Sequence, residues 1–315
     1  MSKIELLPSQ TPVATYIDPM SDFGFKHLFG NEPNKDLLID FLNKVLNGRK
    51  IITEITYNKN EHSGFGVTSR KMIFDLLCAS ENGEKFIIEV QRVRQEFFRD
   101  RAIYYSSRLI HEQAPQGNDW DYSLKEVYFI GLMDFVFDDS DRSEFLHYVR
   151  LSYEKSGKEF YNKLKYIFIE VPKFTKKESE LNGGVDKWLY VLKNLSAMQK
   201  IPVILNTRIF SKLFQIAAVA NLNKEEFMKY EKDQMASWDE YAIKRTLLKE
   251  GLEEGLKEGM EKGMEKGMKK GMEVKSYEFV KNMLITGEFT NSKIARLASV
   301  SEAFVRKVKK DINQD

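Results

Sequence analysis

Two carboxylates interrupt apolar stretches of the sequence. Asp75 lies within KMIFDLLCAS (71–80), and Glu89 lies within EKFIIEVQ (84–91). Both stretches are typical of strands, and the Asn-Gly pair between them predicts a β-hairpin. Like charges on one half-buried face resist ionisation unless a cation lies between them. The hairpin register therefore decides what chemistry these residues can do.

Two registers are open. A two-residue turn at Asn82-Gly83 makes the paired residue numbers sum to 165, which places the carboxylates on opposite faces. A three-residue loop at 81–83, with Gly83 in the left-handed conformation, makes the sum 164 and puts Asp75 directly opposite Glu89. We prefer the three-residue loop, because loops with glycine at the third position are a common hairpin type.

Opposed carboxylates suit a hard divalent ion. Mg²⁺ takes a few carboxylate oxygens together with water and substrate phosphate oxygens. Gln91 lies two residues after Glu89, so it faces the same pocket and can orient a water or hold a phosphate oxygen. These residues predict phosphodiester cleavage. The alternative is an ordinary hairpin with one carboxylate on its wet face.

The rest of the chain up to residue 250 predicts an α+β or mixed α/β core. After a loose leader (1–17), the segment 18–46 predicts a turn and then a helix that ends near Gly48. The apolar stripe of this helix comprises Leu37, Leu38, Phe41, Leu42 and Val45. Further strands are predicted at 51–57, 124–135, 146–155 and 163–171, and helices at 95–113, 185–196, 208–220 and 223–250.

Residues 250–273 form a repeat, EGLEEGLKEGMEKGMEKGMKKGME, in which glycine recurs every fourth residue. On an α-helix this spacing makes a stripe that drifts by about 40° per repeat. Each glycine weakens the helix by about 0.8–1 kcal/mol. The repeat predicts a solvated, charge-balanced linker helix; the alternative is a homo-oligomer that packs through 250–273.

The tail (274–315) predicts a small helix-turn-helix. Thr290 is a helix cap, Ile294 and Leu297 belong to the first helix, Val300-Ser301 makes the turn, and Phe304, Val305 and Val308 pack the second helix. Its basic residues include Lys293, Arg296, Arg306 and Lys307, which makes this the most basic patch of the chain and a DNA-binding candidate. A helical hairpin used for dimer packing is equally compatible.

Composition limits the other function classes. A net charge of +2 does not by itself indicate nucleic-acid binding, and a single cysteine excludes an internal disulfide framework. The opening MSKIELLPSQTPV lacks the apolar region of a secretion signal, and no later run approaches about 18 uncharged apolar residues. We therefore expect a cytoplasmic protein without a membrane partner. Histidines at zinc-binding spacings and phosphate loops are absent from the sequence, so we expect no small-molecule cofactor.

The order Asp75, then Glu89-Val90-Gln91, then the helix FFRDRAIYYSSRL resembles the PD-(D/E)XK nuclease superfamily. With the opening DPMSDFGFKHLFG and the EGL/EGM repeat, the chain looks like the bacterial family of recombination-promoting nucleases and transposases. The resemblance implies a mixed α/β, restriction-endonuclease-like core (helix, strand meander, helix, strand) and an α-helical C-terminal region. The expected divisions are a core (1–175), a helical extension (176–249), the repeat (250–273) and the basic tail (274–315).

The resemblance also assigns roles to site residues. Asp75 matches the motif aspartate and Glu89 the second acidic residue, and both would bind Mg²⁺ or Mn²⁺ with the backbone carbonyl of Val90. Gln91 stands where the superfamily usually has lysine, and it would position the water. Lysine normally stabilises the attacking hydroxide or the charged phosphorane, so this departure removes a positive charge from the site.

Neighbouring helices offer further candidates. Arg99 or Arg101 can supply the missing charge. Asp22 is the candidate for the acid of the first helix, in water-mediated contact with the metal, with Lys26 one turn on; the alternative is that Asp22 caps the helix it precedes. Arg101 and Tyr105, at i and i+4, can face DNA phosphate, or they can form a cation–aromatic pair on the helix surface.

Together these features predict a Mg²⁺-dependent DNA endonuclease that hydrolyses phosphodiester bonds and is linked to recombination or mobile elements. The alternative is a catalytically weak or inactive nuclease scaffold that binds DNA or oligomerises. Cleavage of RNA is a third option, which no sequence feature separates from cleavage of DNA.

Overall fold

The computed structural model describes residues 14–59, 61–62, 72–114 and 121–312. The chain divides into two compact units, one up to Ser237 and one from Trp238. The division falls within a single long helix, α6 (Lys224–Thr286).

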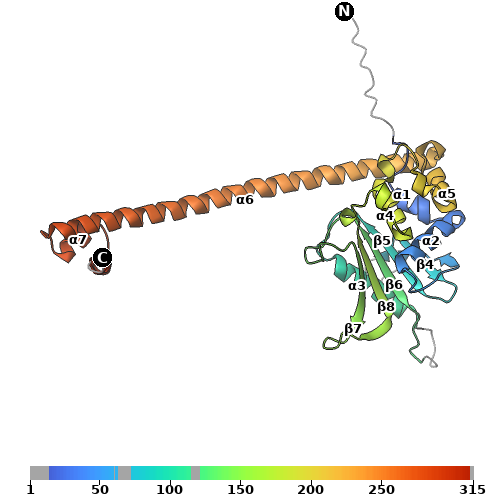
Figure 1. Ribbon diagram of the computed structural model, residues 1–315, viewed down its shortest axis with the longest axis horizontal. Coiled ribbons are helices and arrows are strands. Elements are labelled where there is room, and N and C mark those ends of the chain that lie inside the picture. Colours follow the sequence, from blue (N-terminus) through green and yellow to red (C-terminus); the bar gives the residue numbers. More distant parts are fainter. Residues whose placement is uncertain (1–13, 60, 63–71, 115–120, 313–315) are drawn as a thin grey trace, which may run out of the picture. The chain divides into compact units, whose positions relative to one another are not determined.

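The first unit is built on a six-stranded mixed sheet in the order β1-β4-β5-β6-β8-β7 (Figure 1). β4 and β5 form an antiparallel hairpin, β5, β6 and β8 run parallel, and β7 is antiparallel to β8. The strands are β1 Ile55–Tyr57, β4 Leu76–Ser80, β5 Lys85–Gln91, β6 Val127–Met133, β7 Leu146–Ser152 and β8 Glu159–Glu170, and a separate pair comprises β2 Glu61–His62 and β3 Met72–Ile73.

Helices cover both faces of this sheet (Figure 1). One face packs against α3 (Phe98–His111) in an aromatic core that includes Phe98, Phe129 and Phe168. The other face packs against α1 (Asp22–Phe29), α2 (Lys35–Leu46), α4 (Gly184–Asn194) and α5 (Arg208–Ala217). The predicted apolar stripe of α2 is fully buried in this second core. The core therefore extends to α4 and α5, which contribute the buried side chains of Trp188 and Phe210.

The predicted mixed α/β fold, with a helical C-terminal region, is confirmed. Two predicted strands differ from the structure. The stretch 71–80 is not one strand, because the chain bends at Asp75 between β3 and β4. The stretch 51–57 pairs only at its end, as β1. Segment 18–46 holds two α-helices rather than one, and Asn47, in the left-handed conformation, ends α2 just before Gly48.

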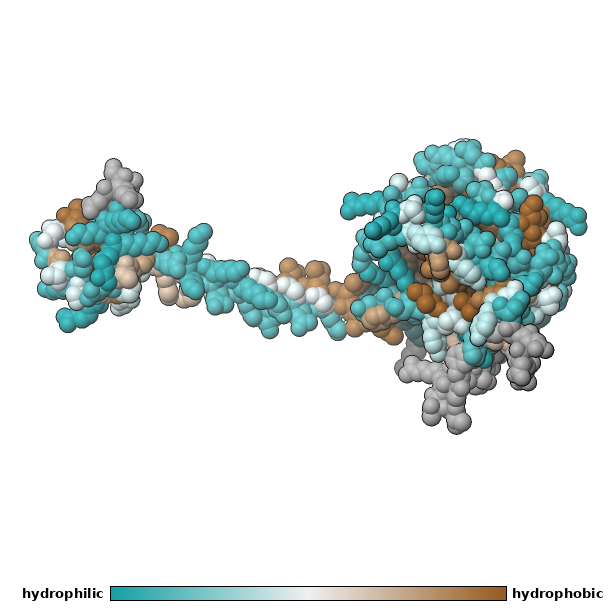
Figure 2. Space-filling model, turned by 90° about the horizontal axis from the view of Figure 1, so that it is seen from below, coloured by the Kyte–Doolittle hydropathy of each residue, from teal (hydrophilic) through white to brown (hydrophobic). Residues whose placement is uncertain are grey.

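The repeat 250–273 lies within α6, which continues without interruption past the predicted helix end at 250. Both hydrophilic and hydrophobic residues are seen on its surface (Figure 2). Its Leu and Met side chains are exposed, and a Cβ added at any of its six glycines would meet nothing within 4 Å. Self-association through these residues stays a prediction.

The tail forms α7 (Asn291–Leu297) and α8 (Glu302–Ile312). Thr290 is the predicted cap, accepting a hydrogen bond from the backbone N–H of Lys293. Ile294, Val305 and Val308 are buried against Val280 of α6. Ile294 and Leu297 both lie in α7, as predicted; the Leu297 side chain is half exposed, whereas Ile294 and Ala295 are buried.

Within the described ranges, none of the helices combines the length and apolar character that crossing a membrane requires.

Candidate active site

The β4–β5 hairpin adopts the three-residue loop. Leu76 pairs with Ile88 and Ala79 with Lys85, which is the register that sums to 164. Gly83 has φ +85°, in the left-handed region that glycine adopts without steric cost. The predicted register is therefore confirmed.

The paired residues of the β4–β5 ladder end at Leu76, and Asp75 contacts the neighbourhood of Glu89 through hydrogen bonds between side chain and backbone. The backbone N–H of Asp75 donates to Oε1 of Glu89 at 3.1 Å. In return, Oδ2 of Asp75 accepts from the backbone N–H of Val90 at 2.8 Å. Each carboxylate is held by the backbone next to the other, which brings the two acidic groups to one point.

Arg101 of α3 provides a positive charge at this point. Its Nη2 donates to Oε2 of Glu89 at 2.8 Å, and its Nη1 donates to Oε1 of Gln91 at 3.1 Å. The amide Nε2 of Gln91 donates to the carbonyl of Val93 at 2.9 Å, which fixes the orientation of the Gln91 side chain. Among the side chains that the structure describes, Nε of Arg101 is one of three buried polar atoms without a hydrogen-bond partner.

Gly131 lets α3 approach the sheet closely enough for Arg101 to reach Glu89. It lies opposite Glu89 on the neighbouring strand β6. A Cβ at this position would lie 3.2 Å from the rings of Phe98 and Phe168, tighter than most real Cβ contacts. Sequence reasoning did not select Gly131; the only signal was a glycine inside the apolar run VYFIGLM.

Burial raises the pKa values of both acids. The Glu89 side chain is 1% exposed. Burial, followed by the charge of Asp75, raises the pKa of Glu89 to about 8, although Arg101 opposes this. Burial also raises the pKa of Asp75, against the hydrogen bond from Val90. The pair therefore lacks enough positive charge for both acids to ionise readily.

α1 lies within electrostatic reach of the pair. Ser21 caps α1 by accepting from Gly24, so the interpretation of Asp22 as the cap is wrong; Asp22 is the first helical residue. Asp22 pairs with Lys26 at 2.5 Å. The charge of Lys26 lowers the pKa of Asp75, and that of Asp22 raises it. A groove of about 560 Å³ between α1 and the start of α6 is lined by both residues and by Lys229 and Lys232.

Residues 19–246 match the sequence model of the family described as PD-(D/E)XK nuclease family transposase. The chain belongs to this PD-(D/E)XK family. No curated protein and no solved structure matches the chain. Family membership gives a restriction-endonuclease-like core and a nuclease-type or mobile-element function, for which DNA is the expected substrate class. PD-(D/E)XK nucleases generally use divalent metals.

The residues present fit such a metal. Two facing carboxylates with raised pKa values form a site that a divalent cation would stabilise, and Mg²⁺ commonly uses only one or two protein carboxylates. Asp75 and Glu89, with the carbonyl of Val90, would hold it. A cluster of three or more His, Cys, Asp or Glu suitable for a metal was not found in the part of the chain that the structure describes. The remaining ligands would thus come from backbone, water and substrate.

The other predicted site residues lie in different settings. Arg99 pairs with Asp139. Arg101 also stacks over the ring of Tyr105 at 5.0 Å, so the predicted cation–aromatic pair is present together with the contact to Glu89. In the second unit, Lys293, Arg296, Arg306 and Lys307 are exposed. DNA binding by these four residues stays a prediction.

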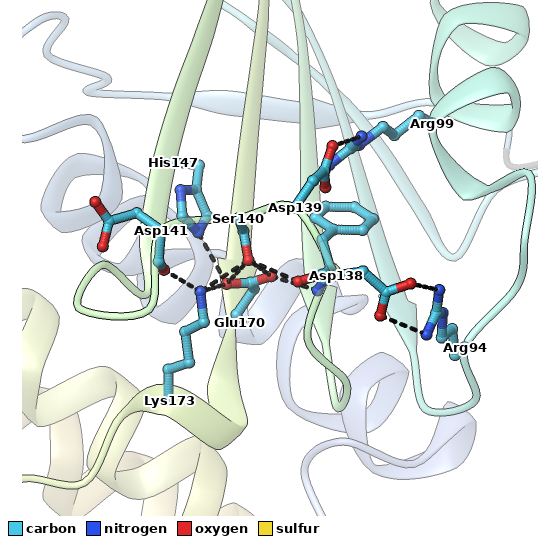
Figure 3. Close-up of polar contacts among 10 residues, drawn as sticks. Arg94, Arg99, Asp138, Asp139, Ser140, Asp141, His147, Glu170 and Lys173 are labelled. Carbon is cyan, nitrogen blue, oxygen red and sulfur yellow. Dashed lines mark hydrogen bonds and ion pairs between the residues drawn. The ribbon is translucent and has the colours of Figure 1, made fainter. Parts of the chain in front are cut away.

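A second buried acid, Glu170, was missed by sequence reasoning. It ends β8 and receives the backbone N–H of Phe137 at 2.6 Å, the Ser140 hydroxyl at 2.8 Å and Nε2 of His147 at 2.9 Å, and it pairs with Lys173 (Figure 3). Burial alone would raise the pKa of Glu170, but Lys173 and the other donors lower it. This cluster anchors the segment between β6 and β7.

Proposed function

We propose that the chain is a metal-dependent DNA endonuclease. The single observation that carries the proposal is the reciprocal pairing of Asp75 and Glu89, two acids with raised pKa values beside a half-buried arginine. Mg²⁺ or Mn²⁺ bound there would polarise the scissile phosphate and lower the pKa of an attacking water. This function would be linked to recombination or mobile elements, as the family description suggests.

Gln91 and Arg101 would share the work of the superfamily's lysine. Oε1 of Gln91 has a second lone pair besides the one that Arg101 uses, and this lone pair can accept from the attacking water. Arg101 would offer its positive charge to the phosphate. Its Nε–H is buried without a hydrogen-bond partner, and a shift of the side chain on DNA binding would let it donate to a phosphate oxygen, which would remove the penalty of leaving that group unpaired.

The groove between α1 and α6 supports a path for DNA beside the acids. Lys26, Lys229 and Lys232 line it together with the acids Asp22, Glu226 and Asp233, and the lysines can contact backbone phosphates without reading sequence. We infer that Asp22 acts there through Lys26, with which it pairs, and that it helps to place a water near the metal.

Nicking of supercoiled plasmid tests the proposal. The wild-type protein is expected to nick DNA only with Mg²⁺ or Mn²⁺, and Asp75→Asn is expected to reduce the rate on the order of 10³-fold, because several kcal/mol of charge stabilisation are lost. Glu84→Gln is the matched control. Glu84 is a buried acid at the other end of the same hairpin, where it pairs with Lys50 at 2.6 Å.

Calorimetric titration with Mn²⁺ separates binding from cleavage. Wild type and Glu84→Gln are expected to bind, and Asp75→Asn is not. Folded wild-type protein that binds DNA but never nicks it would favour the alternative, an inactive nuclease scaffold. Nicking that survives in Asp75→Asn would reject the site assignment.

A further inference from the structure

Two adjacent aspartates form ion pairs with two arginines that lie near the candidate active site in the sequence. Arg94 and Asp138 form a two-bonded fork, with Nη1 to Oδ1 at 2.8 Å (Figure 3). Arg99 and Asp139 form a second fork, with bonds of 2.8 and 2.6 Å. A planar guanidinium binds a carboxylate and a phosphate through the same pair of parallel hydrogen bonds. Each aspartate therefore occupies a position that suits a phosphate group.

The segment that carries the aspartates is held in place on both sides. Just before them, the backbone N–H of Phe137 donates to Glu170, and just after them the hydroxyl of Ser140 donates to the same buried carboxylate. The guanidinium of Arg99 also lies 4.2 Å above the ring of Phe137. The carboxylates are thus presented from a fixed backbone (Figure 3).

The arginines lie close to the acids of the site along the chain. Arg94 is three residues after Gln91, and Arg99 is two residues before Arg101 on the first turn of α3. The N–H of Asp134, where the segment begins, donates to the carbonyl of Gln91 at 2.9 Å. Both arginines therefore lie between Gln91 and Arg101 along the chain.

We propose that Arg94 and Arg99 are two phosphate-binding subsites for the nucleic-acid backbone, and that Asp138 and Asp139 mimic its phosphates and compete for them. The substrate class in this inference rests on the proposed function. All four side chains are more than half exposed, from 51% to 73%. Exposed ion pairs are weak, so DNA can displace the aspartates.

Salt dependence gives the proposal a specific signature. A phosphate contact with a free arginine releases counterions, and log Kd changes with log salt by about 0.9 per phosphate. In the wild-type protein each arginine exchanges a carboxylate for a phosphate. The released carboxylate attracts cations from solution, which offsets the counterions that the DNA releases. The two subsites then contribute little net salt dependence. Removal of the aspartates is expected to restore the full contribution of the two arginines to the salt dependence of binding.

The experiment is a double-mutant cycle on DNA binding. Anisotropy of a short labelled DNA duplex is measured against salt in the Asp75→Asn background, so that cleavage does not interfere. Asp138→Asn with Asp139→Asn is expected to tighten binding about tenfold at low salt and to steepen the slope by about 2, for two phosphates. In the Arg94→Gln and Arg99→Gln background the same change is expected to have no effect.

Two outcomes would overturn the proposal. Unchanged binding on removal of the aspartates would mean that the arginines meet no phosphate. Equal tightening with and without the arginines would mean a general charge effect. Because the cycle reads binding alone, its result is independent of plasmid nicking. Coupling without nicking would retain the phosphate subsites and reject the endonuclease, whereas nicking without coupling would reject only the subsites.

Discussion

Glu89 and Glu170 are two buried acids on one sheet with opposite surroundings. Their side chains are 1% and 0% exposed, and both lie near the C-terminal ends of parallel strands. Glu170 is contacted by a lysine, a histidine, a hydroxyl and a backbone N–H, and its pKa is lowered. Glu89 has one backbone N–H and one arginine but faces a second carboxylate, and its pKa is raised to about 8.

The difference distinguishes an acid whose charge the fold satisfies from one whose charge it leaves partly uncompensated. The donors around Glu170 satisfy its charge within the fold, so the cluster can hold the segment between β6 and β7. The pair at Glu89 is left short of positive charge, which stabilises the protonated form and favours a site that recruits a cation. Equal burial therefore has two consequences, and the number of donors decides which one applies.

Opposite effects on folding stability would sharpen this comparison most. Glu170→Gln is expected to destabilise the first unit by about 3 kcal/mol at pH 8, because the buried Lys173 loses its anion. Glu89→Gln is expected to stabilise it by about 2 kcal/mol at pH 8, because the strained carboxylate is removed. Urea unfolding followed by fluorescence of the buried Trp188 measures both.

Destabilisation of similar size by both substitutions would break the comparison. Glu84→Gln serves as a reference for exchanging a buried, paired acid on the same hairpin as Glu89.

The sequence allowed the Glu89 site to be predicted in part. The Asn-Gly turn and the two apolar runs left two registers open, and the glycine at the third loop position favoured the one that the structure has, in which Gly83 is in the left-handed region. The i, i+4 spacing of Arg101 and Tyr105 predicted their contact on α3. These features depend on residues that are close in sequence.

The Glu170 cluster could not be predicted in this way. Its donors come from residues 137, 140, 147 and 173, which only the tertiary fold brings together. The break in strand 71–80 has a similar origin, because the N–H of Asp75 bonds to the side chain of Glu89 rather than to a strand partner. A local pattern contains no trace of either contact.

The cation partners of the two acids offer a second test. Arg101→Gln is expected to lower the nicking rate about 100-fold, because a positive charge at the phosphate is lost, with a small effect on unfolding. Lys173→Met is expected to reduce stability but not the rate per folded molecule. Adding Gln91→Lys to Arg101→Gln is expected to recover most of the rate, because the lysine replaces the charge at the superfamily position.

Plasmid nicking and the urea midpoint, measured on the same preparations, separate these effects. If Lys173→Met slowed nicking as much as Arg101→Gln, the division into structural and functional acids would be wrong. Failure of Gln91→Lys to rescue would mean that Arg101 acts by orienting Glu89 rather than as a charge at the phosphate.

Dependence on pH is the smallest of the three expected effects. The folded pKa of Glu89 lies above its unfolded value, so the folded state binds the extra proton and stability falls as pH rises from about 4.5 to about 8. Metal binding requires the ionised form of Glu89, so one proton is released when Mn²⁺ binds. Below pH 8 the apparent Kd for Mn²⁺ is therefore expected to decrease about tenfold for each unit by which the pH rises. Glu170, whose pKa is lowered, contributes stability that is lost as the pH falls into the acid range, so its dependence on pH has the opposite sign. Calorimetry with Mn²⁺ at pH 6, 7 and 8 would measure the change in affinity. An affinity that does not depend on pH would mean that Glu89 is already ionised at pH 6. Arg101 would then compensate the charge of Glu89 as fully as Lys173 compensates that of Glu170.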